Sequence, residues 1–211
     1  RGIGLSIAKL LAAQGANVVV NDLDATVAAQ AVEQVRACGA EAIAVPGSVA
    51  DDSFGERIAE ETQKAFGRAD ILVNNAGFLW DGMLHNMGDD QWQKVLDVHA
   101  TAPFRLIRAF APLLRDAGKA ETLNGEAVQD RCVVNISSTS GLHGNLGQAN
   151  YAMAKAGVLG LTKTVAKEWG PFGVRCNAVA FGMVDTRMTR SADAENATTD
   201  DLLPPQGLPP D

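Results

Sequence analysis

The sequence predicts an α/β fold in which a doubly wound parallel sheet is covered by helices on both faces. Short apolar stretches with the length of a buried strand alternate along the chain with longer segments of amphipathic helical period. Strands separated in this way by helices run parallel and are joined by right-handed crossovers. The 211 residues, 46% of them hydrophobic, are enough for one domain of this class.

The elements follow one another in a regular order. A first helix is expected at 5–14, because Gly15 is a suitable residue to end it, and Gly39 and Gly67 end the next two helices in the same way. In chain order we expect a strand at 17–21, a helix at 26–38, a strand at 41–45, a helix at 51–66, a strand at 70–73, two helices within 89–115 that bend or divide at Pro103, a polar insertion at 116–130, a strand at 132–136, a flexible loop at 141–147, a helix at 150–169 and a strand at 174–179.

Both ends of the chain read as interior sequence. It opens with RGIGLSIAKLLAAQG, a loop entering a helix, and it ends with LLPPQGLPPD, without a final strand. We therefore expect a sheet that lacks its first strand and its C-terminal end. A catalytic domain truncated at its N-terminus is expected over 1–190, and a substrate-loop remnant or flexible tail over 191–211.

Charge and cysteine content exclude several classes of function. The net charge of −7 and the pI of about 4.9 argue against a nucleic-acid or anionic-membrane surface, because either needs a basic field. No apolar run of ~18 residues is present, so no membrane span is expected. Cys38, Cys132 and Cys176 lie far apart without metal-ligand spacing. They indicate reduced thiols in a cytoplasm-like compartment and no metal site.

The start of the chain has the features of a dinucleotide site. In the segment Gly2-Ile3-Gly4 the glycines allow the backbone to approach a pyrophosphate at a helix N-terminus, although two glycines there also fit an ordinary turn. Asp22 follows the NVVVN strand, 18 residues after Gly4. An acid ~20 residues after the glycines accepts hydrogen bonds from the adenosine ribose in such sites. An acid in a turn is the alternative.

Asp22 also bears on the choice of cofactor. A carboxylate at the ribose repels a 2′-phosphate and favours NAD over NADP, whereas Arg1 beside the glycines favours NADP. We predict NAD, because no other basic residue lies near Asp22 in the sequence. The amides and small residues that follow the DILV strand suit a loop pressed against a ribose, or an ordinary turn: Asn74, Asn75, Ala76 and Gly77.

A possible centre of chemistry lies near the end of a later strand. Ser138 ends the CVVNI strand region, and Tyr151 follows it by 13 residues. Lys155 lies four residues after Tyr151, so the two share one face of the expected helix with Cβ atoms ~5–6 Å apart. A surface pair of side chains on a helix is the alternative.

Together these residues resemble the short-chain dehydrogenase/reductase family. The shared features are GIG, Asp22, NNAG, the Ser-X12-Tyr-X3-Lys set and CNAVAFGMVDTRMT, and they extend over nearly the whole chain. The resemblance implies a Rossmann-type fold, a nicotinamide cofactor and the interconversion of a secondary alcohol and a ketone. It also implies cofactor contacts by Val49, Gly182, Val184 and Thr186.

The resemblance assigns roles that physical chemistry supports. Tyr151 would be the general acid/base, and Ser138 would hydrogen-bond the substrate oxygen. A free phenol has a pKa of ~10, so work near pH 7 requires a decrease of ~3 units. We expect the ammonium of Lys155 and the positive nicotinamide ring to supply much of it. Lys155 would also hold the nicotinamide ribose.

The sequence departs from the family pattern at three positions. His99 replaces an asparagine that holds a water in a proton relay. A neutral imidazole can serve such a relay, or His99 can be a packing substitution. Phe181-Gly182 stands where the family has Pro-Gly, which puts the path of that loop in doubt. Ser48, beside Val49, replaces an acidic residue and makes the adenine contacts less secure.

Within the family, the chain is similar to (3R)-hydroxyacyl-CoA dehydrogenase modules of peroxisomal-type multifunctional enzymes and to 3-oxoacyl-carrier-protein reductases. This implies a 3-hydroxyacyl/3-oxoacyl thioester of CoA or of an acyl carrier as substrate. A hydroxysteroid or polyol dehydrogenase and a non-catalytic nucleotide-binding scaffold remain alternatives. The helices around 100–115 and 152–169 are apolar over much of their surface, and the resemblance implies a homodimer or homotetramer through them.

Overall fold

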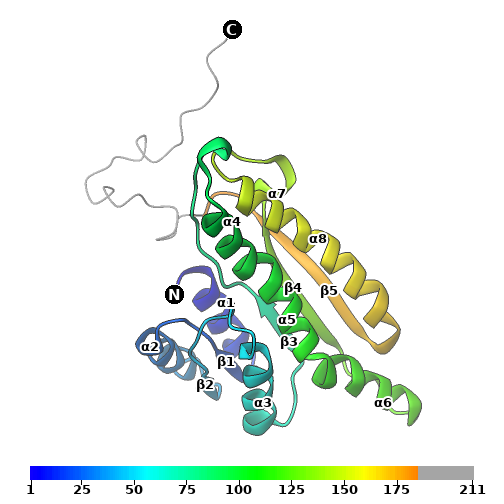
Figure 1. The fold of residues 1–211 in the computed structure, drawn as a ribbon. Coiled ribbons are helices and arrows are strands. Elements are labelled where there is room, and N and C mark those ends of the chain that lie inside the picture. The colour runs from blue at the N-terminus through cyan, green and yellow to red at the C-terminus, as the bar shows by residue number, and fades with distance from the viewer. Residues whose placement is uncertain (185–211) are drawn as a thin grey trace.

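The computed structural model describes residues 1–184, which form five strands and eight α-helices (Figure 1). The elements in chain order are α1 Gly2–Ala13, β1 Val18–Val20, α2 Ala25–Arg36, β2 Ala42–Ala44, α3 Phe54–Phe66, β3 Ile71–Asn74, α4 Asp89–Leu96, α5 Ala102–Ala109, α6 Ala117–Leu123, β4 Arg131–Ser138, α7 Thr139–His143, α8 Ala149–Trp169 and β5 Val174–Phe181. The alternation of strands and helices predicted from the sequence is confirmed.

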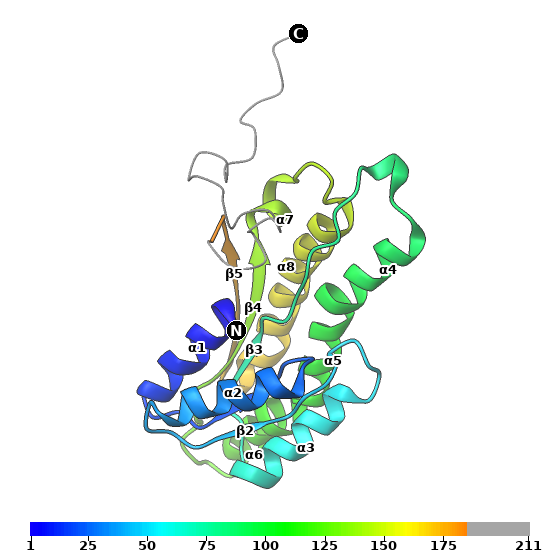
Figure 2. The ribbon, with the colours of Figure 1, turned by 90° about the vertical axis from the view of Figure 1, so that its left-hand side faces the viewer.

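All strand pairs are parallel, as predicted. β1 pairs with β2, and β4 lies between β3 and β5. Figure 2 shows α1 on one face of the three-stranded ladder and α4, α5 and α8 on the other. This is the doubly wound, Rossmann-type α/β arrangement, and it brings the carboxyl ends of β3, β4 and β5 together at one edge.

The sheet is divided into two ladders rather than continuous. Within residues 1–184 no backbone pairing joins β1 to β3. Val19 of β1 and Ile43 of β2 instead pack as side chains against the main core, which includes Phe54, Leu114 and Val133. A second cluster lies on the side of α1 and α2 and consists of Ala12, Val32, Val35 and Ala42. The short ladder is therefore held between two cores.

Several predicted boundaries are wrong. α1 begins at Gly2, three residues early, so the glycines lie in its first turn, and α3 begins only at Phe54. Residues 141–143 of the predicted flexible loop belong to α7. Its first turn is capped because Ser138 Oγ accepts a hydrogen bond from the backbone N–H of Ser140, at 3.2 Å.

The segment expected to hold two helices contains two π-helical turns. The turn Asp97–Thr101 joins α4 to α5 without a break in the helical backbone, and Pro103, which has no N–H to donate, lies in the first turn of α5. A second turn, Pro112–Asp116, leads into α6. Single π turns inside helices shift the side-chain register and are frequent at functional sites. The first of them carries His99.

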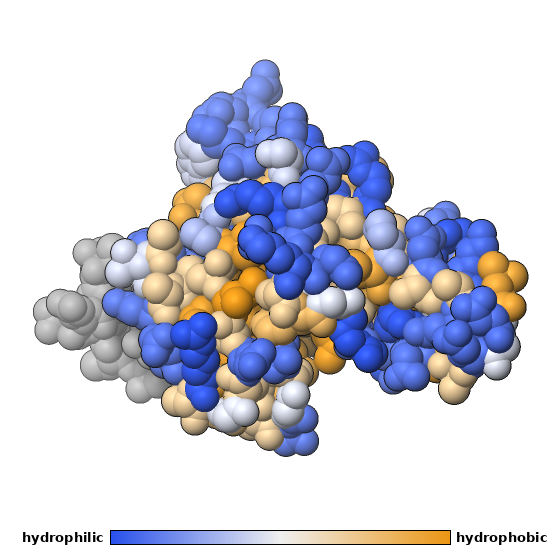
Figure 3. All heavy atoms as spheres, turned by 90° about the horizontal axis from the view of Figure 1, so that it is seen from below, coloured by the Kyte–Doolittle hydropathy of each residue, from blue (hydrophilic) through white to orange (hydrophobic). Residues whose placement is uncertain are grey.

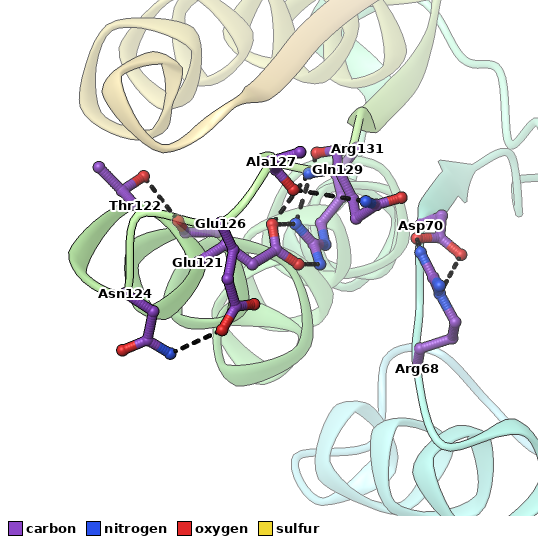
Figure 4. A network of polar contacts seen from close by, with 10 residues as sticks. Arg68, Asp70, Glu121, Thr122, Asn124, Glu126, Ala127, Gln129 and Arg131 are labelled. Carbon is purple, nitrogen blue, oxygen red and sulfur yellow. Dashed lines mark hydrogen bonds and ion pairs between the residues drawn. The ribbon is translucent and has the colours of Figure 1, made fainter.

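The predicted polar insertion at 116–130 is wrong in its first half, which is α6. Figure 4 shows how this helix is held: Glu121 accepts from the guanidinium of Arg131, with 2.8 Å between Nη1 and Oε2, and from the backbone N–H of Gln129. Arg131 is only 5% exposed. The sequence shows charge and polarity here, but not that one acid is paired with a buried arginine.

The end of the molecule remote from α7 is seen in Figure 3. Apolar residues gather near the middle of this face and hydrophilic residues border them. The elements that carry the predicted chemistry lie at the opposite end of the strands (Figure 1).

Candidate functional site

The predicted glycine segment lies where a nucleotide site requires it. Gly2, with φ of +54°, and Gly4 form the start of α1. A Cβ atom on Gly4 would lie 2.6 Å from Nδ2 of Asn75, just beyond β3. The backbone of α1 therefore approaches the loop after β3 more closely than a side chain would permit. A helix N-terminus exposed by glycines fits a pyrophosphate, so these residues fit a dinucleotide.

Asp22 lies beyond the end of β1 and is bound by Arg1. The guanidinium donates two hydrogen bonds, Nη2 to Oδ1 at 2.8 Å and Nε to Oδ2 at 3.1 Å. The hydrogen bond from Arg1 lowers the pKa of Asp22, so this carboxylate is ionised at neutral pH. Asp22, whose carboxylate favours NAD, and Arg1, whose charge favours NADP, thus form one ion pair.

The first two residues of the NNAG segment point in different directions, one into the sheet and one towards α1. Asn74 is buried, and its Nδ2 donates to Oδ1 of Asn135 at 2.7 Å, inside the ladder of β3 and β4. Asn75 faces α1, as described above, and Ala76 is exposed. The side chain of Asn74 is therefore used within the sheet. Val49, predicted to contact adenine, is partly buried and packs against the main core.

The three residues predicted to carry the chemistry converge at the end of β4. Tyr151 lies in the first turn of α8, close enough to Ser138, the last residue of β4, for the serine to lower the pKa of the phenol. Lys155 is 5% exposed, and its Nζ lies 5.6 Å from the centroid of the Tyr151 ring. The same Nζ donates to the carbonyl oxygen of Ile136 at 2.6 Å. The lysine is thus held against the strand and beneath the phenol.

The protonation of this group differs from the expectation. Burial raises the pKa of Tyr151, the hydrogen bond with Ser138 lowers it, and the carboxylate of Asp81 raises it further. The pKa is raised overall because burial outweighs the effect of Ser138, and Lys155 is not among the groups that lower it. Burial also lowers the pKa of Lys155 to about 8. At neutral pH the phenol is protonated and the lysine is largely charged.

His99 lies in the π-helical turn and contacts Tyr151. The two rings meet edge to face with centroids 4.9 Å apart. Nε2 of His99 lies 2.8 Å from the carbonyl oxygen of Phe78, while Nδ1 is buried without a partner. A Cβ on Gly77 would lie 2.3 Å from Cε1 of His99, so a glycine is required there. Burial, and then the charge of Lys155, lower the pKa of His99 to about 3, and the imidazole is neutral.

The remaining predicted contacts lie near the end of β5. Ser138 and Phe181 are register partners in the β4–β5 ladder, and a Cβ on Gly182 would lie 4.0 Å from Cγ2 of Thr139. Gly182 therefore borders the same edge as Ser138, and Val184 follows it by two residues in the chain. Thr186 falls outside the described residues, as does the tail predicted at 191–211.

Sequence reasoning missed two polar residues of this site, Asp81 and Gln148. Gln148 is 7% exposed, and its Nε2 donates to Oδ2 of Asp81 at 3.0 Å. Its Oε1 accepts from Oγ of Ser140 at 2.9 Å. The one available signal was the position of Gln148, three residues before Tyr151, where the helix begins. Nothing in the sequence links it to Asp81, 67 residues away.

Two further classes of site were searched for in the described part of the chain. No group of three His, Cys, Asp or Glu side chains there could hold a metal ion. None of the helices within residues 1–184 has both the length and the apolar character that crossing a membrane requires. The cysteines Cys38, Cys132 and Cys176 are free thiols.

Comparisons with known proteins agree with this geometry. Residues 1–197 match the family model of the short chain dehydrogenases. A 3-oxoacyl-[acyl-carrier-protein] reductase from Synechocystis is 42% identical over 196 residues, which are 92% of this chain and 75% of the relative. The peroxisomal hydratase-dehydrogenase-epimerase of Saccharomyces cerevisiae is 36% identical, over 90% of this chain and 21% of that protein. The crystal structure of a short chain dehydrogenase from Mycobacterium avium superposes with a TM-score of 0.78 and 35% identity, covering 92% of this chain and 69% of the other.

Proposed function

The chain belongs to the short-chain dehydrogenase family, and we propose that it reduces the ketone of a 3-oxoacyl thioester to a 3-hydroxyacyl thioester. Like its family, it is an oxidoreductase that uses a nicotinamide cofactor. The 3-oxoacyl-[acyl-carrier-protein] reductases among its relatives support the choice of substrate. The observation that carries the proposal is the half-buried phenol of Tyr151, which lies against Lys155 and His99 at the start of α8, beside the end of β4 that carries Ser138.

The residues of the chain account for the proton half of the reaction. The hydroxyl of Tyr151 donates its proton to the carbonyl oxygen of the substrate, and Ser138 donates a hydrogen bond to the same oxygen. Lys155 keeps a positive charge close to the phenolate that remains. A reduced nicotinamide, when bound, supplies the hydride that the carbonyl carbon accepts.

His99 serves as a relay in this proposal rather than as an acid. Because its pKa is about 3, it does not become charged at physiological pH. A neutral imidazole passes a proton by accepting at one nitrogen and donating at the other. Its contact with the Tyr151 ring and its unpartnered Nδ1 support this role, in which it helps to return a proton to the phenolate.

We also propose where the cofactor binds and which one is preferred. Gly2, Ile3 and Gly4 hold the pyrophosphate, and Asp22 accepts hydrogen bonds from the adenosine ribose. The ionised carboxylate supports NAD, and its pairing with Arg1 leaves that arginine less available for a 2′-phosphate. Further cofactor contacts are assigned to Val49, Asn75, Ala76, Gly77, Gly182, Val184 and Thr186, with the backbone of Asn74.

Three broader features belong to the same proposal. The catalytic domain spans 1–190. Two or four copies associate through the helices α5 and α8, which expose Phe104 and Met153. The three free thiols support a reducing, cytoplasmic compartment.

A spectrophotometric assay tests the function. NADH oxidation by acetoacetyl-CoA is measured in the wild type and in Tyr151→Phe, which removes only the hydroxyl. We expect the variant to lose at least about a hundredfold in kcat. Similar rates in both proteins would remove Tyr151 from the mechanism. NADH binding without turnover of any thioester, steroid or polyol would favour a non-catalytic nucleotide-binding protein.

A further inference from the structure

The segment around Asp81 is tied to the start of α8 at several points. The backbone N–H of Gly82 donates to the carbonyl oxygen of Gly147 at 2.8 Å. Asn150, which is fully buried, donates from Nδ2 to the carbonyl oxygen of Trp80 at 3.1 Å. The hydrogen bond from Gln148 to Asp81 lies between these two backbone contacts in the sequence of both segments. The loop after β3 and the loop before α8 are therefore joined directly beside Tyr151.

The amide of Gln148 can make its contacts in only one orientation. A carboxylate only accepts hydrogen bonds, so the NH2 group must face Asp81. The oxygen then faces Ser140 Oγ at 2.9 Å and Nδ2 of Asn145 at 3.1 Å. Gln148 is also the N-cap residue of α8, but its side chain makes no capping hydrogen bond. Its buried amide is therefore not explained by the helix that it begins.

The contacts of Gln148 lead to the reactive hydroxyl from two sides. On one side, Ser140 donates its backbone N–H to Oγ of Ser138, and Ser138 in turn lowers the pKa of Tyr151. On the other side is the carboxylate of Asp81, whose charge acts on Tyr151. The geometry points to Gln148 as a positioning residue that bridges Ser140 and Asp81. Through Ser140 it fixes the position of the Ser138 hydroxyl, and by its own hydrogen bond it fixes the Asp81 carboxylate, in both cases relative to Tyr151. This role rests on the reaction proposed above.

Within residues 1–184, the titratable groups that face Tyr151 change their charge at different pH values. Lys155 lies below the ring on α8, and His99 faces it from the π-helical turn. His99, with a pKa of about 3, is neutral throughout the range in which a phenol titrates. Lys155, with a pKa of about 8, is largely neutral where a phenol titrates. In that range the remaining charge is that of Asp81.

The first test compares two glutamines that hold the same loop. Gln148→Leu removes the bonds to Asp81, Ser140 and Asn145. Gln91→Leu removes only the 2.8 Å bond to the carbonyl oxygen of Trp80. We expect Gln148→Leu to lower kcat for acetoacetyl-CoA reduction about ten- to a hundredfold, with KM changed far less, because the oxygen-binding hydroxyl is misplaced. Gln91→Leu should stay within about twofold of the wild type. Equal losses in both variants would mean that loop anchoring alone matters and would overturn the proposal.

The second test needs no turnover. Tyr151 is the only tyrosine in the chain, so the ultraviolet absorbance of phenolate reports its ionisation alone. Asp81→Asn retains an acceptor for Gln148 but removes the charge, and it should lower the pKa of Tyr151. Adding Gln148→Leu to Asp81→Asn should raise that pKa again, because the hydrogen bond from Ser138 is weakened.

Circular dichroism at each pH confirms that the variants remain folded during the titration. The same pKa of Tyr151 in Asp81→Asn and in the double variant would refute the positioning role of Gln148, and an unchanged pKa in Asp81→Asn would refute the role of Asp81. If the wild type reduces no oxoacyl thioester, the proposed function fails, but the titration still decides whether Gln148 and Asp81 act on Tyr151.

Discussion

The protonation states of three neighbouring residues suit the donation of a proton to a carbonyl oxygen. Tyr151 is a protonated phenol because burial raises its pKa. His99 is a neutral imidazole, and Lys155 is the one cation in direct contact with the ring among the described residues. A protonated phenol is ready to donate to a carbonyl oxygen, whereas oxidation of an alcohol first requires that it lose its proton. In the proposed reduction Tyr151 donates the proton, and the charge of Lys155 lies close to the phenolate that remains.

The pKa of Lys155 leads to a prediction for the pH dependence of cofactor use. Burial lowers it to about 8, so the ammonium is lost as the pH rises through that value. We expect kcat/KM for NADH, which reports the free enzyme, to fall above about pH 8. Lys155→Arg remains charged in that range, so the decline should move to higher pH, from a lower starting rate. A profile that stays flat to about pH 10 in the wild type would contradict this role of Lys155.

At the scale of elements, α6 is held to β4 by a single ion pair that can be tested. Glu121→Gln should lower Tm by several degrees, because Arg131, 5% exposed, would keep its charge without a partner. Glu33→Gln, at an exposed pair with Arg36 on α2, is the matched control and should leave Tm nearly unchanged. Calorimetry measures both, and equal small effects would show that the Arg131 pair does not hold α6.

The same pair has a defined dependence on pH. The hydrogen bond from Arg131 lowers the pKa of Glu121 to about 2, below the usual value of 4.5. The stability that it contributes is therefore fully present above about pH 4.5 and is lost as the pH falls towards 2. The difference in Tm between the wild type and Glu121→Gln should shrink over that range.

An element could be predicted from the sequence where neighbouring residues determine it, and could not where residues far along the chain determine it. Gly67 ends α3 in a left-handed conformation, with φ of +70°, and a glycine after an amphipathic run is visible in the sequence. Tyr151 and Lys155 were predicted to lie together because they are four residues apart on one helix, and Ser138 was added from its position at a strand end and from the family resemblance. The π-helical turn at His99, α7 and the contact between Gln148 and Asp81 depend on packing and on partners far along the chain. No local pattern indicates them.

At the scale of the whole molecule, the ladder of β1 and β2 and the ladder of β3, β4 and β5 are connected by contacts of α1 and by the packing of their side chains. Gly4 at the start of α1 approaches Asn75 after β3, and Arg1 binds Asp22 after β1. The proposed dinucleotide site is therefore formed by both ladders and belongs to neither alone. A ligand that binds there links two parts that no backbone hydrogen bond connects within residues 1–184.

This arrangement predicts where a cofactor stabilises the protein. Hydrogen exchange measured by mass spectrometry should be faster in α1, β1, α2 and β2 than in β3, β4 and β5, since the first group has only three-residue strands and a small second core. NADH at a hundred times its Kd adds about 2.7 kcal/mol to the free energy of unfolding. Its protection should be concentrated in the first group, and NADPH should protect less at equal concentration.

Asp22→Ala should remove most of the difference in protection between NADH and NADPH, because the carboxylate that repels the 2′-phosphate is gone. Equal protection of both ladders by NADH, or stronger protection by NADPH in the wild type, would show that Asp22 and the division of the sheet do not determine how the cofactor is held.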